Sequence, residues 1–236
     1  MVGAGRGERL RASLAPGEGG PPAEGKAFAD LAGRPLLAHA LEAVAASPEV
    51  DRVVAVVAPE ALERARELGA SLRHGDKLAP PVAGGAERQD SVERGLASLP
   101  AEVEWVAVHD AARPLVRPED VTRVVRAARE HGAALLAVPV ADTLKQVEGD
   151  LVRATPPRAE YRAAQTPQVF RADWLREALA KARAEGVHGT DDAALVERLG
   201  VAVRVLPGDA SNFKITTAED LERAAGVLAR RAREDS

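Results

Sequence analysis

The sequence predicts an α/β protein with a doubly wound, mainly parallel sheet, and three observations support this prediction. Short β-branched runs alternate with segments that carry apolar residues at helical spacing, as in repeated strand–helix–strand units. Proline and glycine stand where such helices would begin and end, as at Pro118, Gly132 and Gly186. The length of 236 residues suits one domain, so we expect residues 1–236 to form a single unit.

The expected elements follow in order along the chain. Buried strands are expected at residues 52–58, 104–109, 133–140 and 201–206. Helices are expected at residues 36–47, 60–69, 91–99, 119–132 and 173–186, with a last helix beginning near Thr217. The glycine- and proline-rich residues 11–25 are expected to form a loop. Residues 165–170 and 190–192 are expected in loops or at helix starts, where threonine can act as a cap.

Residues 142–156 break the alternation. They are typical of two strands joined by Gly149 and Asp150, a two-residue hairpin turn. Neither face of this hairpin is cleanly apolar, and an isolated two-stranded ribbon is only marginally stable in water. We therefore expect the hairpin to pack against a partner, either in this chain or in another.

The composition excludes several classes of function. The formal net charge of −4 argues against a broad nucleic-acid surface. No apolar run approaches the roughly 20 residues that span a bilayer, so neither nucleic acid nor membrane is an expected partner. The sequence has no cysteine, which rules out disulfides and thiolate metal sites and fits a location in the reducing cytoplasm.

The N-terminal segment combines alternating glycines with two separated cations: Gly3, Gly5, Gly7, Arg9 and Lys26. A dinucleotide-binding loop would need a third glycine where Glu8 stands, and a P-loop over residues 20–26 would need a hydroxyl where Ala27 stands. A third interpretation is the G-x-G-x-R loop of a nucleotidyltransferase. Its backbone N–H groups can approach a triphosphate while arginine and lysine neutralise developing charge. A solvated tail is the alternative.

Only Met1 and Val2 precede this glycine loop, whereas a phosphate-binding loop in a doubly wound sheet normally follows a central strand. We therefore expect the first strand to be missing from this sequence, either because the start site was assigned too late or because the fold is remodelled. In both cases Met1 should lie at the centre of the sheet, with either a gap one strand wide or a locally closed sheet behind it.

Two further segments offer candidate binding residues. Asp110 and Arg113 follow an apolar strand and should lie at the carboxyl edge of the sheet, where ligands bind in such folds. They could equally be a turn residue and a surface cation. The glycine pair at 84–85 precedes a helix that carries Ser91, a possible donor to a base or ribose, although an ordinary helix entry is the simpler interpretation. His109 is expected to be structural.

Taken in order, the motifs resemble the 2-C-methyl-D-erythritol 4-phosphate cytidylyltransferases of the non-mevalonate isoprenoid pathway. The resemblance runs from Gly3 to about Leu221 through G-x-G-x-R, K-x-F, G-G-x-x-R-x-x-S-V-x-x-G-L, V-H-D-A-A-R-P, D-T-x-K, Q-T-P-Q-x-F, T-D-D and N-F-K-I-T. V-H-D-A-A-R-P and Q-T-P-Q are specific to this family and its close relatives, such as the ribitol-phosphate cytidylyltransferases. The resemblance implies a Rossmann-like nucleotidyltransferase fold with a protruding β-hairpin arm.

The resemblance also implies an activity. Enzymes of this family transfer CMP from CTP to 2-C-methyl-D-erythritol 4-phosphate with Mg²⁺, giving 4-diphosphocytidyl-2-C-methyl-D-erythritol and pyrophosphate. The family acts as a homodimer, and the hairpin at 142–156 matches its dimerisation arm. A relative that uses another polyol phosphate, such as ribitol 5-phosphate, and a catalytically silent nucleotide-binding protein are the alternatives.

Roles for individual residues follow from the same resemblance. Arg9 and Lys26 match the pair that stabilises the transition state, and Asp110 matches an acidic residue near the phosphates and Mg²⁺. The positions that match residues around CTP are Ala4, Gly5, Gly85, Ala86, Ser91, Ala111 and Arg113. The positions that match residues holding the polyol phosphate are Thr143, Arg158, Thr166, Thr190 and Lys214, with Arg158 supplied by the partner subunit.

Two departures from the family pattern concern the catalytic pair. The family's first strand, an apolar run ending in P-A-A-G, is missing. In addition, residues 11–25 are expanded, and Gly25 stands where a proline usually precedes the lysine. A third departure is Ala86, which replaces a residue that is often polar. The expected chemistry needs no general base, because the attacking phosphate oxygen is already anionic. A local cluster of cations should instead bring two anions together: Arg9, Lys26, Arg113, Arg158 and Lys214.

Overall fold

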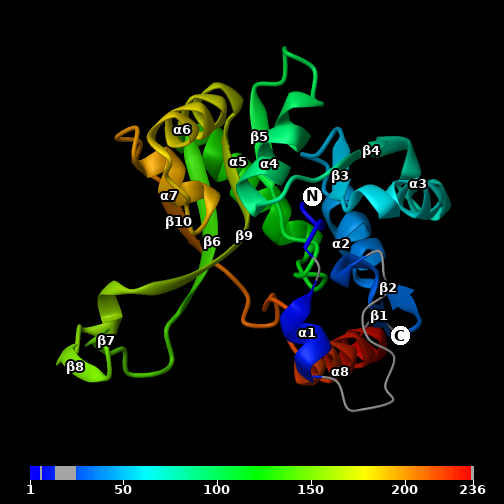
Figure 1. The fold of residues 1–236 in the computed structure, drawn as a ribbon. Coiled ribbons are helices and arrows are strands. Elements are labelled where there is room, and N and C mark those ends of the chain that lie inside the picture. Colours follow the sequence, from blue (N-terminus) through cyan, green and yellow to red (C-terminus); the bar gives the residue numbers. More distant parts are fainter. Residues whose placement is uncertain (6, 14–24, 235–236) are drawn as a thin grey trace.

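The computed structural model describes residues 1–5, 7–13 and 25–234 (Figure 1). Its helices are α1 Glu8–Ser13, α2 Leu36–Ala45, α3 Leu62–Ser71, α4 Arg88–Ala97, α5 Pro118–His131, α6 Ala172–Glu185, α7 Asp192–Glu197 and α8 Ala218–Glu234. Its strands are β1 Asp30–Leu31, β2 Arg34–Pro35, β3 Val53–Val57, β4 Leu78–Ala83, β5 Trp105–Val108, β6 Ala133–Pro139, β7 Gln146–Glu148, β8 Leu151–Ala154, β9 Arg162–Arg171 and β10 Arg204–Pro207.

The central sheet is mainly parallel, as predicted. Strands β10, β6, β9 and β5 lie side by side in that order, and β3 pairs with β4 in parallel. β10 runs parallel to β6, whereas β9 runs antiparallel to both of its neighbours, β6 and β5. Val2 joins the two groups through parallel bridges to Val56 in β3 and to Asp110 just beyond β5. Among these strands, only β9 opposes the common direction.

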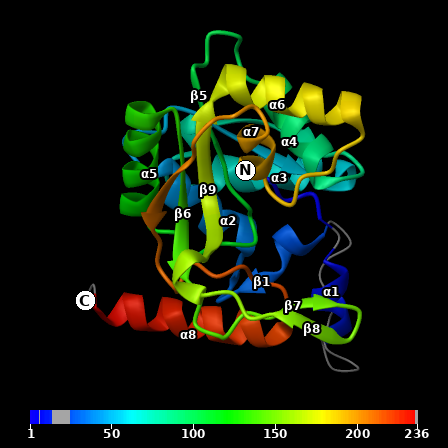
Figure 2. The same ribbon diagram turned by 90° about the vertical axis from the view of Figure 1, so that its left-hand side faces the viewer.

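Helices cover both faces of this sheet, which makes the fold doubly wound. One apolar cluster packs α2, α3 and α5 against one face, with Ala134 and Leu136 among its strand residues. A second cluster packs α4, α6 and α7 against the other face, with Ala133 and Leu135. Successive residues of β6 thus point to opposite layers, as strand geometry requires. Figure 2 shows α5 and α6 on opposite sides of β6 and β9.

Met1 and Val2 lie at the centre of the sheet, as expected. Their main-chain hydrogen bonds reach β3 on one side and the end of β5 on the other, with N···O distances between 2.8 and 3.0 Å. Because Val2 forms a parallel bridge on each side, β3 and β5 are about two strand spacings apart there, roughly 9–10 Å. A cavity of about 450 Å³ extends behind the stub between these strands, lined by residues that include Val54 and Ala107. The gap predicted behind Met1 is therefore present.

The sequence-based interpretation was wrong in three places. Residues 165–170 lie inside β9 rather than in a loop, residues 11–13 close helix α1, and β4 was not expected. β4 contains Pro80 and Pro81, which lack backbone N–H groups, and it lies at the edge of the sheet, where prolines are tolerated. The remaining residues of the loop and of the alternative P-loop, 14–24, are outside the described residues.

The hairpin predicted at 142–156 is formed by β7 and β8, which pair through a turn at Gly149. It protrudes from the body of the molecule (Figure 1). Three of its apolar side chains are largely exposed: Val147 at 60%, Leu151 at 67% and Val152 at 58%. Since exposed apolar side chains of this size favour burial, the arm has a surface suited to a partner.

Candidate active site

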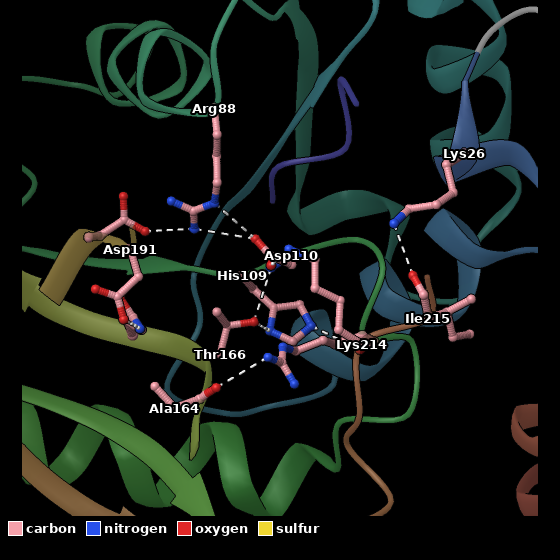
Figure 3. A network of polar contacts seen from close by, with 12 residues as sticks. Lys26, Arg88, His109, Asp110, Ala164, Thr166, Asp191, Lys214 and Ile215 are labelled. Carbon is pink, nitrogen blue, oxygen red and sulfur yellow. Dashed lines mark hydrogen bonds and ion pairs between the residues drawn. The ribbon is translucent and has the colours of Figure 1, made fainter. Parts of the chain in front are cut away.

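Asp110 lies at the carboxyl end of β5, at the centre of a buried polar network (Figure 3). Its Oδ1 atom accepts hydrogen bonds from Nε and Nη2 of Arg88 at 3.3 and 3.2 Å, and its Oδ2 atom accepts one from Nζ of Lys214 at 2.7 Å. Burial opposes ionisation of this carboxyl group. The charges of Arg88 and Lys214 outweigh that effect and hold the pKa of Asp110 well below its usual range.

A chain of hydrogen bonds beneath Asp110 fixes its backbone. The N–H group of Asp110 donates to Oγ1 of Thr166 at 3.1 Å, and Thr166 Oγ1 lies 2.9 Å from Nδ1 of His109. His109 Nε2 lies 3.1 Å from the carbonyl oxygen of Arg113, which can only accept, so we assign the proton to Nε2. Burial lowers the pKa of His109 to about 4. The ring is therefore neutral at pH 7, which supports the expectation that His109 is structural.

Lys26 is held beside the glycine loop and beside Lys214. Its backbone N–H group donates to the carbonyl of Gly5 at 3.3 Å, and its Nζ atom donates to the carbonyl of Ile215 at 2.9 Å (Figure 3). Gly25 supports this arrangement with a φ of 99°, which glycine adopts without strain. Burial and the neighbouring Lys214 charge lower the pKa of Lys26 to about 8. Substitution of the usual proline by Gly25 therefore still leaves Lys26 in the site.

Arg9 is exposed on α1, which packs against α8. Leu10 is buried in an apolar cluster with Ala224, and Oγ of Ser13 accepts a hydrogen bond from the N–H group of Ala218 at 2.8 Å. The charge of Arg9 contributes to the lowered pKa of Lys26, so the two cations act on the same region. That the two residues act as a catalytic pair stays a prediction.

Arg113 points back into the same network. Its Nη1 atom donates to the carbonyl of Asn212 at 2.8 Å, and Nη2 donates to the carbonyl of Ala164 at 3.2 Å. Among the described residues no carboxylate forms an ion pair with Arg113 or with Lys26, so both keep positive charge that a bound anion can neutralise.

The expected nucleotide-binding loop is tightly packed. A Cβ atom at Gly84 would lie 2.3 Å from Cβ of Ala4, so only glycine fits beside the first loop. Ser91 stabilises the loop by accepting from the N–H group of Gly85 at 3.1 Å and donating to the carbonyl of Glu87 at 3.2 Å. Ala111 is buried beside Gly3, whereas Gly5 and Ala86 are exposed. The expected roles of these positions toward CTP stay predictions.

The residues expected to hold the polyol phosphate are divided between two places. Thr166 and Lys214 are in the network around Asp110, and Thr190 is exposed immediately before α7. Thr143 and Arg158 are exposed at the base of the hairpin, where Nη1 of Arg158 donates to the carbonyl of Ala141 at 2.7 Å. In the described part of this single chain, no hydrogen bond or ion pair joins Thr143 or Arg158 to the network around Asp110.

Sequence reasoning missed two charged residues of the site, Arg88 and Asp192. Nη2 of Arg88 lies 2.7 Å from Oδ2 of Asp192, whose side chain is only 1% exposed. Both residues belong to motifs that the sequence displays, the arginine of G-G-x-x-R and the last aspartate of T-D-D. Nothing in the motifs shows that these side chains meet, because they are 104 positions apart.

One carboxylate in this network suits a magnesium ion that is held mainly by phosphates. Asp110 is ionised, and a carboxylate has about four lone-pair sites, so contacts with Arg88 and Lys214 leave acceptor capacity. Mg²⁺ often takes only one or two protein carboxylates and completes its shell with substrate phosphates and water. No cluster of three potential metal-ligating side chains occurs among the described residues.

Comparison with known proteins decides the family. The sequence model described as 2-C-methyl-D-erythritol 4-phosphate cytidylyltransferase matches residues 1–230. The chain belongs to this cytidylyltransferase family. A family member from Acidobacterium capsulatum is 44% identical over 216 residues, which cover 89% of this chain and 90% of that protein. One from Geobacillus kaustophilus is 41% identical over 234 residues, covering 99% and 97% of the two chains.

Solved structures of cytidylyltransferases agree with the fold. The crystal structure of 2-C-methyl-D-erythritol 4-phosphate cytidylyltransferase from Thermus thermophilus matches with a TM-score of 0.70 and 40% identity, covering 87% of this chain and 94% of that one. A 4-diphosphocytidyl-2C-methyl-D-erythritol synthase from Anaerococcus prevotii matches with a TM-score of 0.81 and 27% identity, covering 97% and 95%. The predictions of a nucleotidyltransferase fold and of a cytidylyltransferase are confirmed. No helix in the described part of the chain is long and apolar enough to cross a membrane.

Proposed function

We propose that this cytidylyltransferase transfers CMP from CTP to 2-C-methyl-D-erythritol 4-phosphate, releasing pyrophosphate. The observation that supports this most strongly is the set of cations around Asp110. Lys26 and Arg113 have no carboxylate partner among the described residues, and they lie at the carboxyl edge of the sheet beside the glycine loop. Two polyanionic substrates need such a local excess of positive charge to approach one another.

The reaction forms one P–O bond and breaks another. An anionic phosphate oxygen of the polyol phosphate attacks the α-phosphorus of CTP, and the bond from that phosphorus to the bridging oxygen of pyrophosphate breaks. Pyrophosphate leaves with the electron pair. No proton has to be removed from the nucleophile, so positioning and electrostatics supply the catalysis. The neutral His109, buried beneath the network, is not required as a base.

We assign to Arg9 and Lys26 the stabilisation of the negative charge that develops on the phosphate in the transition state. Lys26 is oriented by its contact with the carbonyl of Ile215, which leaves ammonium protons for phosphate oxygens. The proposed contacts with CTP come from the backbone of Gly5 and Gly85 and from Arg113, together with Ala4, Ala86, Ser91 and Ala111. The proposed contacts with the polyol phosphate come from Thr143, Arg158, Thr166, Thr190 and Lys214.

Asp110 is the residue that would hold Mg²⁺. When bound, the ion would neutralise charge on the CTP phosphates and favour departure of pyrophosphate. The protein's own contribution is to keep the Asp110 carboxylate ionised and fixed, which Arg88 and Lys214 do through the contacts described above.

We further propose a homodimer in the cytoplasm. The exposed apolar side chains on the β7–β8 arm support self-association, because their burial against a second copy would be favourable. Such a dimer would let Arg158 of one chain complete the site of the other. The cytoplasmic location rests on the cysteine-free sequence.

The test incubates the purified chain with CTP and Mg²⁺ and supplies either 2-C-methyl-D-erythritol 4-phosphate or ribitol 5-phosphate. Pyrophosphate is quantified, and the nucleotide product is identified by its mass. Fast turnover with methylerythritol phosphate is the expected result. Faster turnover with ribitol phosphate would reassign the acceptor, and binding of CTP without product from either acceptor would identify a catalytically silent protein.

A further inference from the structure

Arg88 bridges two parts of the site that are far apart in the sequence. It begins α4, directly after the loop of Gly84 and Gly85, and its guanidinium contacts both Asp110 and Asp192. Asp110 lies just beyond β5, whereas Asp192 begins α7. The planar guanidinium has five donors in a fixed fork, so it can hold two carboxylates in one defined relative position.

Because the two carboxylates are buried, loss of this bridge would destabilise the site. The side chains of Asp192 and Asp110 are 1% and 9% exposed, and that of Arg88 is 31% exposed. In the described part of the chain, Arg88 is the one cation that forms an ion pair with Asp192, whereas Asp110 also pairs with Lys214. Without the arginine, Asp192 would be a buried carboxylate with no partner, which is strongly unfavourable.

The segment before α7 depends on side-chain contacts for its position. The N–H group of Gly189 donates to Oε1 of Gln89 on α4 at 3.4 Å, and the N–H group of Ala193 donates to Oε1 of Gln168 on β9 at 3.0 Å. Thr190 lies between these two anchors. Arg88 adds the charged anchor, because Asp192 follows Thr190 by two positions.

We propose that Arg88 is a positioning residue that couples the nucleotide side of the site to the polyol-phosphate side. Through Asp110 it fixes the carboxylate beside the phosphates, and through Asp192 it fixes the segment that carries Thr190. This inference rests on the proposed function for the roles of Asp110 and Thr190. The bridge itself depends only on the contacts of Arg88.

The test compares Arg88→Met, Arg88→Lys and Asp192→Asn with the unchanged chain. Arg88→Met is expected to lower kcat about 10- to 100-fold and to raise KM for the polyol phosphate about tenfold, with a smaller change in KM for CTP. Asp192→Asn should raise KM for the polyol phosphate with less effect on kcat, because Asp110 keeps its contacts. Arg88→Lys should lie between Arg88→Met and the unchanged chain, because it restores one charge without the fork.

Hydrogen exchange supplies a readout that does not depend on turnover. In Arg88→Met the amides of Gly189, Ala193 and Ala194 should exchange about tenfold faster or more, while those of α5 should not change. Arg126→Met is the matched control, because Arg126 pairs with Glu49 away from the site. It should alter neither kinetics nor exchange around α7.

The outcomes separate this inference from the proposed function. If the unchanged chain transfers CMP but Arg88→Met keeps its KM for the polyol phosphate and its exchange rates around α7, Arg88 is not a positioning residue. If Arg88→Met does not fold, Arg88→Lys and Asp192→Asn decide by the same two readouts. If the unchanged chain transfers no CMP, the proposed function fails, and faster exchange in Arg88→Met would still support the bridge.

Discussion

Nζ of Lys214 lies 2.7 Å from Oδ2 of Asp110, although 104 positions separate the two residues in the sequence. The contact joins the loop before α8 to the end of β5. A second link lies beside it, because the N–H group of Ile215 donates to the carbonyl of Ala112 at 2.8 Å. The N-F-K-I-T segment is thereby attached to the V-H-D-A-A-R-P segment, and Lys214 of the first segment pairs with the carboxylate of Asp110 in the second.

Asp110→Asn should therefore affect stability as well as activity. The substitution removes the negative charge with which both Arg88 and Lys214 form ion pairs. We therefore expect the free energy of unfolding to fall by about 1–3 kcal/mol. Urea unfolding measures this. Asp173→Asn is the control, because Asp173 pairs with Arg171 on the exposed surface and should change stability by less than about 0.5 kcal/mol. Equal effects of the two substitutions would contradict the structural role given to Asp110.

The buried N-terminus should make stability depend on pH. Burial lowers the pKa of the Met1 ammonium group from 8.0 to about 6. Between pH 6 and 8 the unfolded chain binds more protons at this group than the folded chain, so stability should rise with pH over this window. The expected rise is about 2–3 kcal/mol.

Denaturant unfolding at pH 6 and pH 8 measures this rise, and an N-terminally acetylated chain is the control. The acetylated chain cannot protonate at that position, so its stability should change less between the two pH values. Equal pH dependence with and without the acetyl group would show that Met1 is not the group responsible.

The cavity behind Met1 should accept one more strand. β5 offers four residues beyond the stub, so an extension of four β-branched residues before Met1 could pair with both β3 and β5. Burial of each such side chain contributes about 1.5–3 kcal/mol before the cost of ordering the chain. We expect Tm to rise by several degrees. A glycine–serine extension of equal length is the control, and an equal Tm for both extensions would exclude pairing in the cavity.

A site shared between two chains should allow complementation. If Arg158 acts in the partner's site, a hybrid of Arg158→Ala and Arg9→Ala chains contains one intact site and one site that lacks both arginines. With random exchange in a two-fold dimer, about one quarter of the sites should be intact. Pyrophosphate release from the mixture should approach that fraction. No recovery, with subunit exchange verified by mass, would place Arg158 in its own chain's site.

The elements that the sequence predicted well are those buried on both faces. β3 and β6 are continuous apolar runs, and the apolar side of α5 repeats at helical spacing after Pro118. β9 was missed because its centre carries polar residues, Gln165 and Gln168, which are nonetheless buried. Their amide groups find partners in other segments, as Gln168 does at Asp191, and a local pattern cannot show such contacts.

The residues of the candidate site also fall into those that a local sequence pattern can identify and those that it cannot. Asp110 and Arg113 could be named as candidates from their place after a strand, since the carboxyl edge of a parallel sheet is fixed by topology. Arg88 and Asp192 were not predicted, because their contact depends on how α4 and α7 pack on the same face of the sheet. Such packing cannot be predicted from residue types and their spacing along the chain.

The most direct test of the account is the effect of Lys26→Ala on turnover and on CTP affinity, measured on the same preparation. Lys26 is proposed to act on charge that develops in the transition state. Turnover should therefore fall about 10²- to 10³-fold, or 3–4 kcal/mol, while the Kd for CTP from calorimetry changes by only a few-fold. Lys77→Ala is the matched control, because Nζ of Lys77 also donates to backbone carbonyls but lies away from the site. Near-normal turnover of Lys26→Ala, or a loss of CTP affinity as large as its loss of turnover, would contradict the account.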